Sequence, residues 1–418
     1  FDFVMGIIVG LIIACFHFLV NSANLPSIQD EYDGTQLQST VNRNAYQTEL
    51  LNKVGDQIYI LKLQNLLFFG TILSIEEKIN IMLDREEKSR IIKYLILDFK
   101  NIKTDQIDYS AAEGFNRIKR FVSSKNITLI ISSIKETDTI YKVFNKVGLL
   151  EDVELFNDLN SALEWCENKY LYHYKLLKNQ QLAKLNVDKK EMSMPNIKVN
   201  NKDIKGFLNI ASSPMFANTP RNDMFYKAAK NVINTETEVG KNLYQAINKN
   251  KSGTSDLLQK NDHQSTNYCL SLFLQSFKTF IEEKDFDKWS PISAYFKKVT
   301  LNPHEIISND NCVILVESGL IKISYSVTEN TTKTESVYET LAKKSAYGKI
   351  TNNYYKIAPE FNDTVHAETE SDIWILDHEK LNLLKKQNAD LYIDVLTLIS
   401  ALNQYRYKKL LRFTIASG

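Results

Sequence analysis

Residues 96–118 read ILDFKNIKTDQIDYSAAEGFNRI, and this stretch decides the fold of the first half of the chain. It opens with an apolar run of the length of a buried strand, continues through a polar loop and ends in a helical pattern. The apolar positions of that helix lie three and four residues apart, at Ala111, Phe115, Ile118 and Val122. The stretch therefore predicts a strand, a loop and a helix in succession.

The same alternation extends from about residue 51 to residue 175. Strand patterns occupy 58–63, 94–99 and 127–131, and helical patterns occupy 75–82, 111–122, 139–147 and 159–170. Strands that alternate with helices predict a β-sheet with helices packed on it, which is the α/β class.

The length and composition of the chain are those of a folded globular protein. The chain has 418 residues, of which 44% are hydrophobic and 24% charged, and this length suggests two or three domains. With 51 Lys and Arg against 50 Asp and Glu, the chain lacks the basic excess of a nucleic-acid-binding protein. The four cysteines share no CxxC spacing, which favours free thiols in a reducing compartment.

The first 22 residues predict a membrane-spanning helix. Residues 3–20 form an apolar run in which only His17 is polar, close to the shortest length that crosses a bilayer. A signal peptide, a buried soluble helix and a single-pass anchor are the alternatives. Because the chain starts at Phe1 and not at Met, we expect it to be part of a longer protein.

Small residues recur on one face of this predicted helix, at Gly6, Gly10 and Ala14. Such spacing lets the backbones of neighbouring membrane helices approach closely. We therefore expect residues 1–22 to be the last transmembrane helix of a larger bundle, and residues 23–50 to be a connector.

Three segments of the α/β region resemble the STAS domain of SulP anion permeases. They are IYILKLQNLLFFGTILSIEEKI at 58–79, the stretch 96–118 quoted above, and KVFNKVGLLEDVELFNDLNSALEW at 142–165. In that family the STAS domain follows the last helix of the transport bundle. The resemblance implies that residues 51–175 are a cytosolic STAS domain and that the rest of the transport bundle lies upstream.

The resemblance also points to Ser110 as a regulatory phosphosite. In soluble STAS regulators this loop is phosphorylated to switch partner binding, and Ser110 is predicted at a helix N-terminus, where free N–H groups favour a phosphate. Here Ala111 stands where the family has glycine. The alternative is that Ser110 only caps the helix.

Residues 176–266 are predicted to be a flexible linker, because Lys, Asn, Gln and Ser dominate and few apolar faces are sustained. Two Ser/Thr-Pro dipeptides in this segment, at Ser213 and Thr219, are candidate proline-directed phosphorylation sites.

Residues 267–418 predict a second domain. An amphipathic helix over 270–281 precedes short β-rich runs separated by turn residues, and two helices close the chain. This order predicts a small antiparallel barrel or jelly roll with flanking helices.

Three segments of this domain resemble the cyclic-nucleotide-binding fold: VTLNPHEIISNDNCVILVESGLIKISYSV at 299–327, AYGKI at 346–350, and TVHAETESDIWILDHEKLNLL at 364–384. The departures fall at the ligand site. Gly348-Lys349 replaces the family's Gly-Glu pair, and no arginine stands near Phe361, a few residues before Thr364. A phosphate would lose its bidentate partner there. We therefore expect a degenerate pocket at Gly348, Lys349, Phe361 and Thr364, no cofactor, and a barrel that contacts protein.

The sequence offers no catalytic signature. It contains no GxSxG, P-loop or HExxH motif, and its six histidines lack metal-ligand spacing. We therefore expect neither an enzyme nor a metal site.

A SulP bundle, a STAS domain and this barrel in one chain resemble a fungal branch of the permease family at the vacuolar membrane. The resemblance implies a transporter of basic amino acids or of sulfate-like anions, a homodimer, and soluble domains in the cytosol. The alternatives are a pure dimer scaffold and a ligand sensor that binds a nucleotide in the barrel.

Overall fold

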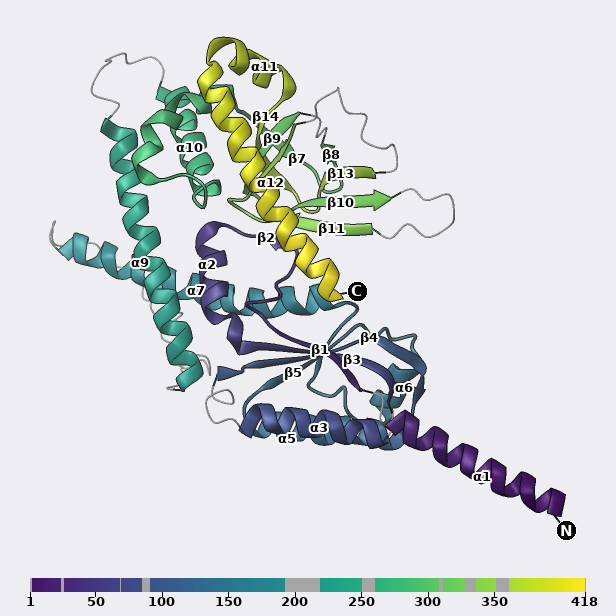
Figure 1. Cartoon of the computed structure of the whole chain (residues 1–418). Coiled ribbons are helices and arrows are strands. Elements are labelled where there is room, and N and C mark those ends of the chain that lie inside the picture. Colours follow the sequence, from purple (N-terminus) through teal and green to yellow (C-terminus); the bar gives the residue numbers. More distant parts are fainter. Residues whose placement is uncertain are drawn as a thin grey trace. The chain divides into compact units, whose positions relative to one another are not determined.

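The computed structural model describes residues 2–23, 26–67, 69–84, 91–191, 219–249, 260–307, 311–327, 336–350 and 361–417 (Figure 1). The chain divides into two compact units. The first unit consists of Phe1–Ser39 and Leu51–Ala228, and the second of Thr40–Leu50 and Ala229–Gly418.

The first unit is built on a five-stranded sheet of order β1-β3-β4-β5-β6. Strands β3 to β6 run parallel, and β1 is antiparallel to β3. The described elements are α1 (Asp2–Ala23), β1 (Ile28–Asp33), η1 (Gly55–Gln57), β3 (Ile58–Leu67), α3 (Phe69–Asp84), β4 (Tyr94–Ile107), α5 (Tyr109–Ser124), β5 (Thr128–Ser132), α6 (Thr139–Lys146), β6 (Glu154–Phe156) and α7 (Leu159–Glu191).

Both faces of this sheet are buried. Leu95, Ile96 and Leu97 are successive residues of β4, and all three side chains are inaccessible to solvent. One face packs on α3, α5 and α6 in a single hydrophobic cluster, and α7 lies on the opposite side of the sheet (Figure 1). Parallel strands covered on both faces read as continuous apolar runs, which explains the pattern at 94–99. The predicted α/β domain is therefore confirmed.

The second unit contains two antiparallel sheets, of order β2-β11-β10-β13-β8 and β12-β9-β14-β7, with β2 added in parallel. Its strands are β2 (Val41–Asn42), β7 (Lys297–Leu301), β8 (Ile306–Ile307), β9 (Cys312–Ser318), β10 (Ile321–Val327), β11 (Ser336–Leu341), β12 (Ala346–Lys349), β13 (Phe361–Ala367) and β14 (Ser371–Leu376). Its helices are α10 (Lys260–Ser276), η3 (Glu283–Tyr295), α11 (His378–Gln387) and α12 (Ala389–Ser417). Helix α2 (Ala45–Val54) and helix α9 (Pro220–Lys249) begin in one unit and end in the other.

Strand β9 separates the two cores of this unit. Ile314 faces the cluster between the sheets, whereas Val313 and Leu315 face the cluster formed with helices α10, η3, α11 and α12. Helices therefore cover the outer face of one sheet (Figure 1). The order helix, antiparallel strands, two closing helices is the order predicted from the sequence.

Two predicted segments need correction. The connector predicted at 23–50 supplies β1 to the sheet of the first unit and β2 to a sheet of the second, since exposed sheet edges accept further strands. The flexible linker predicted at 176–266 contains the end of α7, the whole of the 30-residue helix α9 and the start of α10.

Helix α9 has a buried apolar face, which explains why this segment forms a helix. Phe225, Ala229, Val232 and Leu243 recur at helical spacing and are at most 4% exposed. Pro220 occupies the first helical position, where its fixed φ favours helix initiation. The abundance of Asn and Lys in this segment concealed that periodicity.

In the part of the chain that the structure describes, no helix combines the length and the apolar character needed to cross a membrane. The structure thus does not show the spanning helix predicted for residues 1–22.

Candidate functional site

The predicted pocket lies in the second unit, where β12 and β13 approach each other. Lys349 ends β12, and its Nζ lies 2.5 Å from Oδ1 of Asp363 on β13. The hydroxyl of Tyr347 donates to Oδ2 of the same carboxylate at 3.2 Å. The ammonium group that the sequence offers to a phosphate is therefore paired with a carboxylate of the same chain.

One predicted pocket residue, Thr364, does not line this site. Thr364 is exposed, whereas its neighbour Val365 is fully buried in the core between the sheets. Thr364 thus lies on the outer face of β13, because successive side chains of a strand point to opposite faces. Phe361 opens β13, and its side chain lies outside the described residues.

Gly348 is occupied by protein packing. A Cβ added at Gly348 would lie 2.9 Å from Cγ1 of Ile399 on α12. The side-chain amide of Asn403, one turn further along α12, donates to the Gly348 carbonyl at 3.0 Å. The glycine is therefore required for the close approach of α12 to β12, where the family resemblance had suggested a contact with a nucleotide.

The guanidinium of Arg406 completes this region. Its Nε and one terminal nitrogen donate to Oε2 of Glu339 on β11 at 3.0 and 2.6 Å, and that terminal nitrogen also donates to the Tyr325 hydroxyl at 3.0 Å. The guanidinium carbon lies 4.9 Å from the centre of the Tyr347 ring. Burial raises the pKa of Tyr325 to about 12, so its hydroxyl stays protonated at neutral pH.

The same carboxylate joins a distant part of the chain. Oε2 of Glu339 accepts from Nδ2 of Asn42 at 3.1 Å, and Nζ of Lys409 donates to the Val41 carbonyl at 2.5 Å. Val41 and Asn42 form β2, which pairs with β11. The segment that lies between β1 and β3 in the sequence is thus attached to both β11 and α12.

Sequence reasoning missed Glu339, Tyr325, Tyr347, Asn403 and Arg406. One signal was present, because Arg406 follows Ile399 and Leu402 on the apolar face of α12 at steps of three and four. A charge on such a face indicates a buried partner. Nothing in the sequence names Glu339 as that partner.

The STAS-like loop of the first unit has the predicted geometry. Asp108 is the N-cap of α5, and its Oδ1 accepts from the Ala111 amide at 2.5 Å. Ser110 is exposed in the first turn of α5. Asp108, and not Ser110, therefore caps the helix, and the hydroxyl of Ser110 stands open to solvent.

The two linker phosphosites have different positions. Ser213 lies outside the described residues. Thr219 is exposed just before α9, and its hydroxyl oxygen accepts from the Asn222 amide at 3.4 Å. Thr219 and Pro220 thus form the start of a helix, with the threonine as cap and the proline at the first helical position.

The small residues of α1 have no packing partner among the described residues. A Cβ added at Gly6 or Gly10 would meet nothing within 4 Å, and Ala14 is exposed. Their predicted role in helix packing stays a prediction.

The first unit also buries a polar row across its sheet. Lys62 of β3 is in register with Asp98 of β4, and both side chains are 1% exposed. Oδ1 of Asp98 accepts from the hydroxyls of Ser132 at 3.0 Å and Ser133 at 2.5 Å. Burial raises the pKa of Asp98 against the lowering effect of these hydroxyls and of Lys62, and burial lowers the pKa of Lys62.

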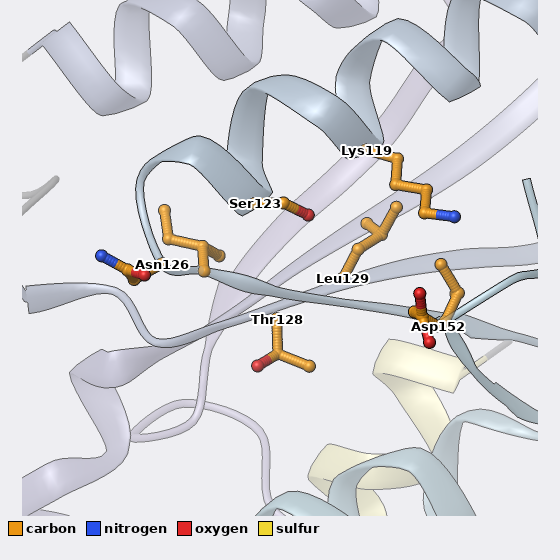
Figure 2. Close-up of a pocket in the computed structure, with 8 residues that line it drawn as sticks. Lys119, Ser123, Asn126, Thr128, Leu129 and Asp152 are labelled. Carbon is orange, nitrogen blue, oxygen red and sulfur yellow. The ribbon is translucent and has the colours of Figure 1, made fainter. Parts of the chain in front are cut away.

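An open pocket of about 320 Å³ lies beside β5 in the first unit. Figure 2 shows Lys119 and Ser123 on α5 and Thr128 and Leu129 on the strand. The ammonium of Lys119 donates to the backbone carbonyls of Gly148 and Glu151. The ammonium of Lys119 in this pocket is thus bound to the backbone. Among the described residues, no cluster of three or more His, Cys, Asp or Glu side chains could hold a metal ion.

Residues 49–162 match the family model of the STAS domain. The class that fold and match together define is therefore a protein with a STAS domain followed by an antiparallel β domain with flanking helices.

The chain is 41% identical to the vacuolar basic amino acid transporter VSB1 of Saccharomyces cerevisiae, over 447 aligned residues that include 100% of this chain and 41% of that protein. It is also 24% identical to glutaminase 2 of Bradyrhizobium diazoefficiens over 160 residues, which are 38% of this chain and 24% of that protein. The chain thus spans less than half of the length of either relative.

Solved structures similar to the chain include a cyclic nucleotide-binding domain from Methylobacillus flagellatus. It shares 10% sequence identity at a TM-score of 0.26, and the match covers 35% of this chain and 82% of that domain.

Proposed function

We propose that this chain is the C-terminal regulatory region of a transporter that moves basic amino acids across the vacuolar membrane, and that it is not an enzyme. The observation that carries the proposal is the 41% identity to VSB1 along the whole of this chain. Sulfate-like anions, which the resemblance to SulP permeases also suggested, are the alternative substrates.

Helix α1 is the element that joins this region to the membrane part of the longer protein. Its apolar side chains are strongly exposed, with Phe3 at 82% and Phe16 at 68%. An exposed apolar surface of this size marks an interaction with protein or lipid. The partner we propose is the apolar membrane part, with Gly6, Gly10 and Ala14 at the contact, and with both units in the cytosol.

The β domain acts by protein contacts and not by binding a cyclic nucleotide. The Lys349 ammonium is paired with Asp363, and the Arg406 guanidinium is paired with Glu339. A phosphate placed here would compete with two carboxylates for these cations, and it would lose the charge-assisted bonds that hold it. Helix α12 packs directly against Gly348.

The test uses vacuolar membrane vesicles that contain the full-length protein. We expect uptake of labelled arginine and lysine, and no uptake of labelled sulfate. Uptake of sulfate without either amino acid would overturn the substrate assignment. Addition of cyclic AMP or cyclic GMP at micromolar concentration should leave the uptake rate unchanged, and a change would favour the ligand sensor.

Removal of residues 268–418 separates regulation from scaffolding. We propose that the full-length protein is a homodimer and that the β domain regulates the rate of transport. A changed uptake rate at unchanged dimer content supports regulation, whereas loss of the dimer supports the pure scaffold. The dimer content is measured by cross-linking of the same vesicles.

A further inference from the structure

The surroundings of Arg406 have the chemistry of a ligand site. A carboxylate (Glu339), a phenolic hydroxyl (Tyr325) and the face of an aromatic ring (Tyr347) converge on one planar cation. Guanidinium groups are bound in this way, through hydrogen bonds in the plane of the group and stacking above it. Arg406 is 5% exposed and Glu339 is 3% exposed, so the contact is shielded from water.

These three recognition groups and the guanidinium come from different parts of the second unit. Tyr325, Glu339 and Tyr347 belong to strands β10, β11 and β12. The guanidinium comes from α12, the last helix of the chain. We propose that Glu339, Tyr325 and Tyr347 form a guanidinium-binding site which Arg406 fills from within, and that this internal ligand holds both α12 and residues 40–50 on the β domain.

The second part of the proposal follows from the contacts of Glu339. Its Oε2 accepts from Arg406 on α12 and also from Asn42 on β2. Lys409, one turn after Arg406, donates to the carbonyl of Val41. Removal of the guanidinium leaves a buried carboxylate without its counter-charge, which destabilises the elements that enclose it. Both α12 and β2 enclose Glu339, so both should loosen together.

The shape of the site selects the class of ligand. A planar guanidinium reaches Glu339 and Tyr325 with separate N–H groups while its face lies on the Tyr347 ring. An ammonium is a compact, strongly hydrated point charge, and it lacks a flat face to lie on the ring. A guanidinium compound should therefore refill the site of a variant that lacks Arg406, and an amine of similar size should not.

The experiment is hydrogen exchange on the 418-residue chain and its Arg406→Ala variant. We expect exchange of residues 40–50 and of α12 to become on the order of 100-fold faster in the variant, as for a buried ion pair that loses one partner. Methylguanidine at millimolar concentration should restore the protection of both segments. Methylammonium chloride at the same concentration should not. The chain with Arg406 intact should not respond to either compound.

Two results would overturn the proposal. One is unchanged exchange of residues 40–50 in Arg406→Ala, and the other is equal rescue by methylguanidine and methylammonium. The variant Arg412→Ala, which removes an exposed arginine of the same helix, is the matched control and should resemble the unaltered chain.

If Arg406→Ala does not fold, Arg406→Gln keeps part of the side-chain volume and removes the charged guanidinium. This variant should still loosen α12 and residues 40–50 while the sheet of the first unit keeps its protection. Loosening of α12 alone would contradict the shared attachment at Glu339. In the double variant Arg406→Ala with Glu339→Gln, methylguanidine should restore nothing.

Discussion

Cγ1 of Ile399 on α12 lies 2.9 Å from the point where a Cβ on Gly348 would stand. Contacts below 3.0 Å are not tolerated by real Cβ atoms, so α12 can approach β12 this closely only because residue 348 is a glycine. The contact fixes α12 against the strand that carries Tyr347, on whose ring the Arg406 guanidinium lies.

Gly348→Ala should destabilise the second unit by about 1–3 kcal/mol, because a methyl group must be forced into a packed contact. The measurement is the unfolding transition together with the hydrogen exchange of α12. Combining it with Ile399→Ala should give a loss smaller than the sum of the two single losses, since the second change removes the clashing atoms.

Gly240→Ala is the control for this pair. Gly240 is exposed in α9, and an added Cβ would meet nothing within 4 Å. Alanine is favoured over glycine in a helix by up to about 1 kcal/mol, so this variant should gain stability. A similar loss in both variants would mean that the Ile399 contact is not the cause.

Asp108→Ala should weaken the start of α5 by about 0.5–2 kcal/mol, because the Ala111 amide loses its acceptor. The change is measured as faster hydrogen exchange in the first turn of α5. Ser110→Ala should have little effect, since Ser110 is exposed and does not cap the helix. A larger effect from Ser110→Ala would reverse these two roles.

Phosphorylation of Ser110 remains a prediction for the cell. The exposed hydroxyl lies in the first turn of α5, where N–H groups and the helix dipole favour a phosphate. Phosphopeptide mapping of the full-length protein from growing and from starved cells should find the modification in one state. Complete absence of phosphate at Ser110 in both growing and starved cells would contradict the proposed phosphorylation switch.

Lys93 should have a pKa of about 8, well below that of an ordinary lysine. Burial, and next the positive charge of Arg221, lower its pKa from 10.5 to about 8. The unfolded chain therefore binds more protons between about pH 8 and 10.5, and stability should rise with pH in that window. A lysine titration by NMR measures the midpoint, which Arg221→Gln should raise.

Arg120→Gln is the control for Arg221→Gln, since it removes an exposed arginine of α5. The midpoint of Lys93 should stay in place in this variant. The variant Lys93→Met should lack the rise of stability between about pH 8 and 10.5. An unchanged slope would assign the rise to another group.

Asp98 should make the stability of the first unit fall as the pH rises, which is the opposite of the effect of Lys93, and Asp98→Asn should remove this dependence. Burial raises the pKa of Asp98 above its ordinary 3.8, so the folded chain keeps a proton that the unfolded chain has lost. Stability contributed by this group is present at low pH and falls as the pH rises above about 3.8. The variant should lose that fall while the Ser132 and Ser133 hydroxyls still donate to the remaining amide oxygen. Stability curves from pH 3 to pH 7 check the result, and parallel curves for both chains would contradict it.

The local sequence pattern was sufficient to predict those strands and helices whose own apolar residues show the period of the element. The apolar runs at 94–99 and 312–316 are strands buried on both faces, and their composition shows it without reference to any partner. The helix at 111–122 is visible for the same reason, because its buried side chains recur at helical spacing. The α/β domain and the antiparallel β domain were therefore predictable.

Helix α9 was not predicted from local sequence pattern. The apolar residues of its buried face are present in the sequence at helical spacing, but polar residues outnumber them. Because the composition is polar, the segment was predicted to be a linker. Strand β2 has only the two residues Val41 and Asn42, which is too short for any periodicity. Its existence depends on β11, nearly 300 residues away in the chain.

The sequence by itself determined the two domains of this protein, because strand and helix periods are local facts. It also predicted a degenerate nucleotide pocket, from the absence of an arginine near Phe361. Only the tertiary structure decided which partner the buried guanidinium of the second unit meets. Arg406 and Glu339 are separated by 67 residues, and their pairing has no local signature. A buried charge requires a partner, and which partner it meets depends on the path of the whole chain.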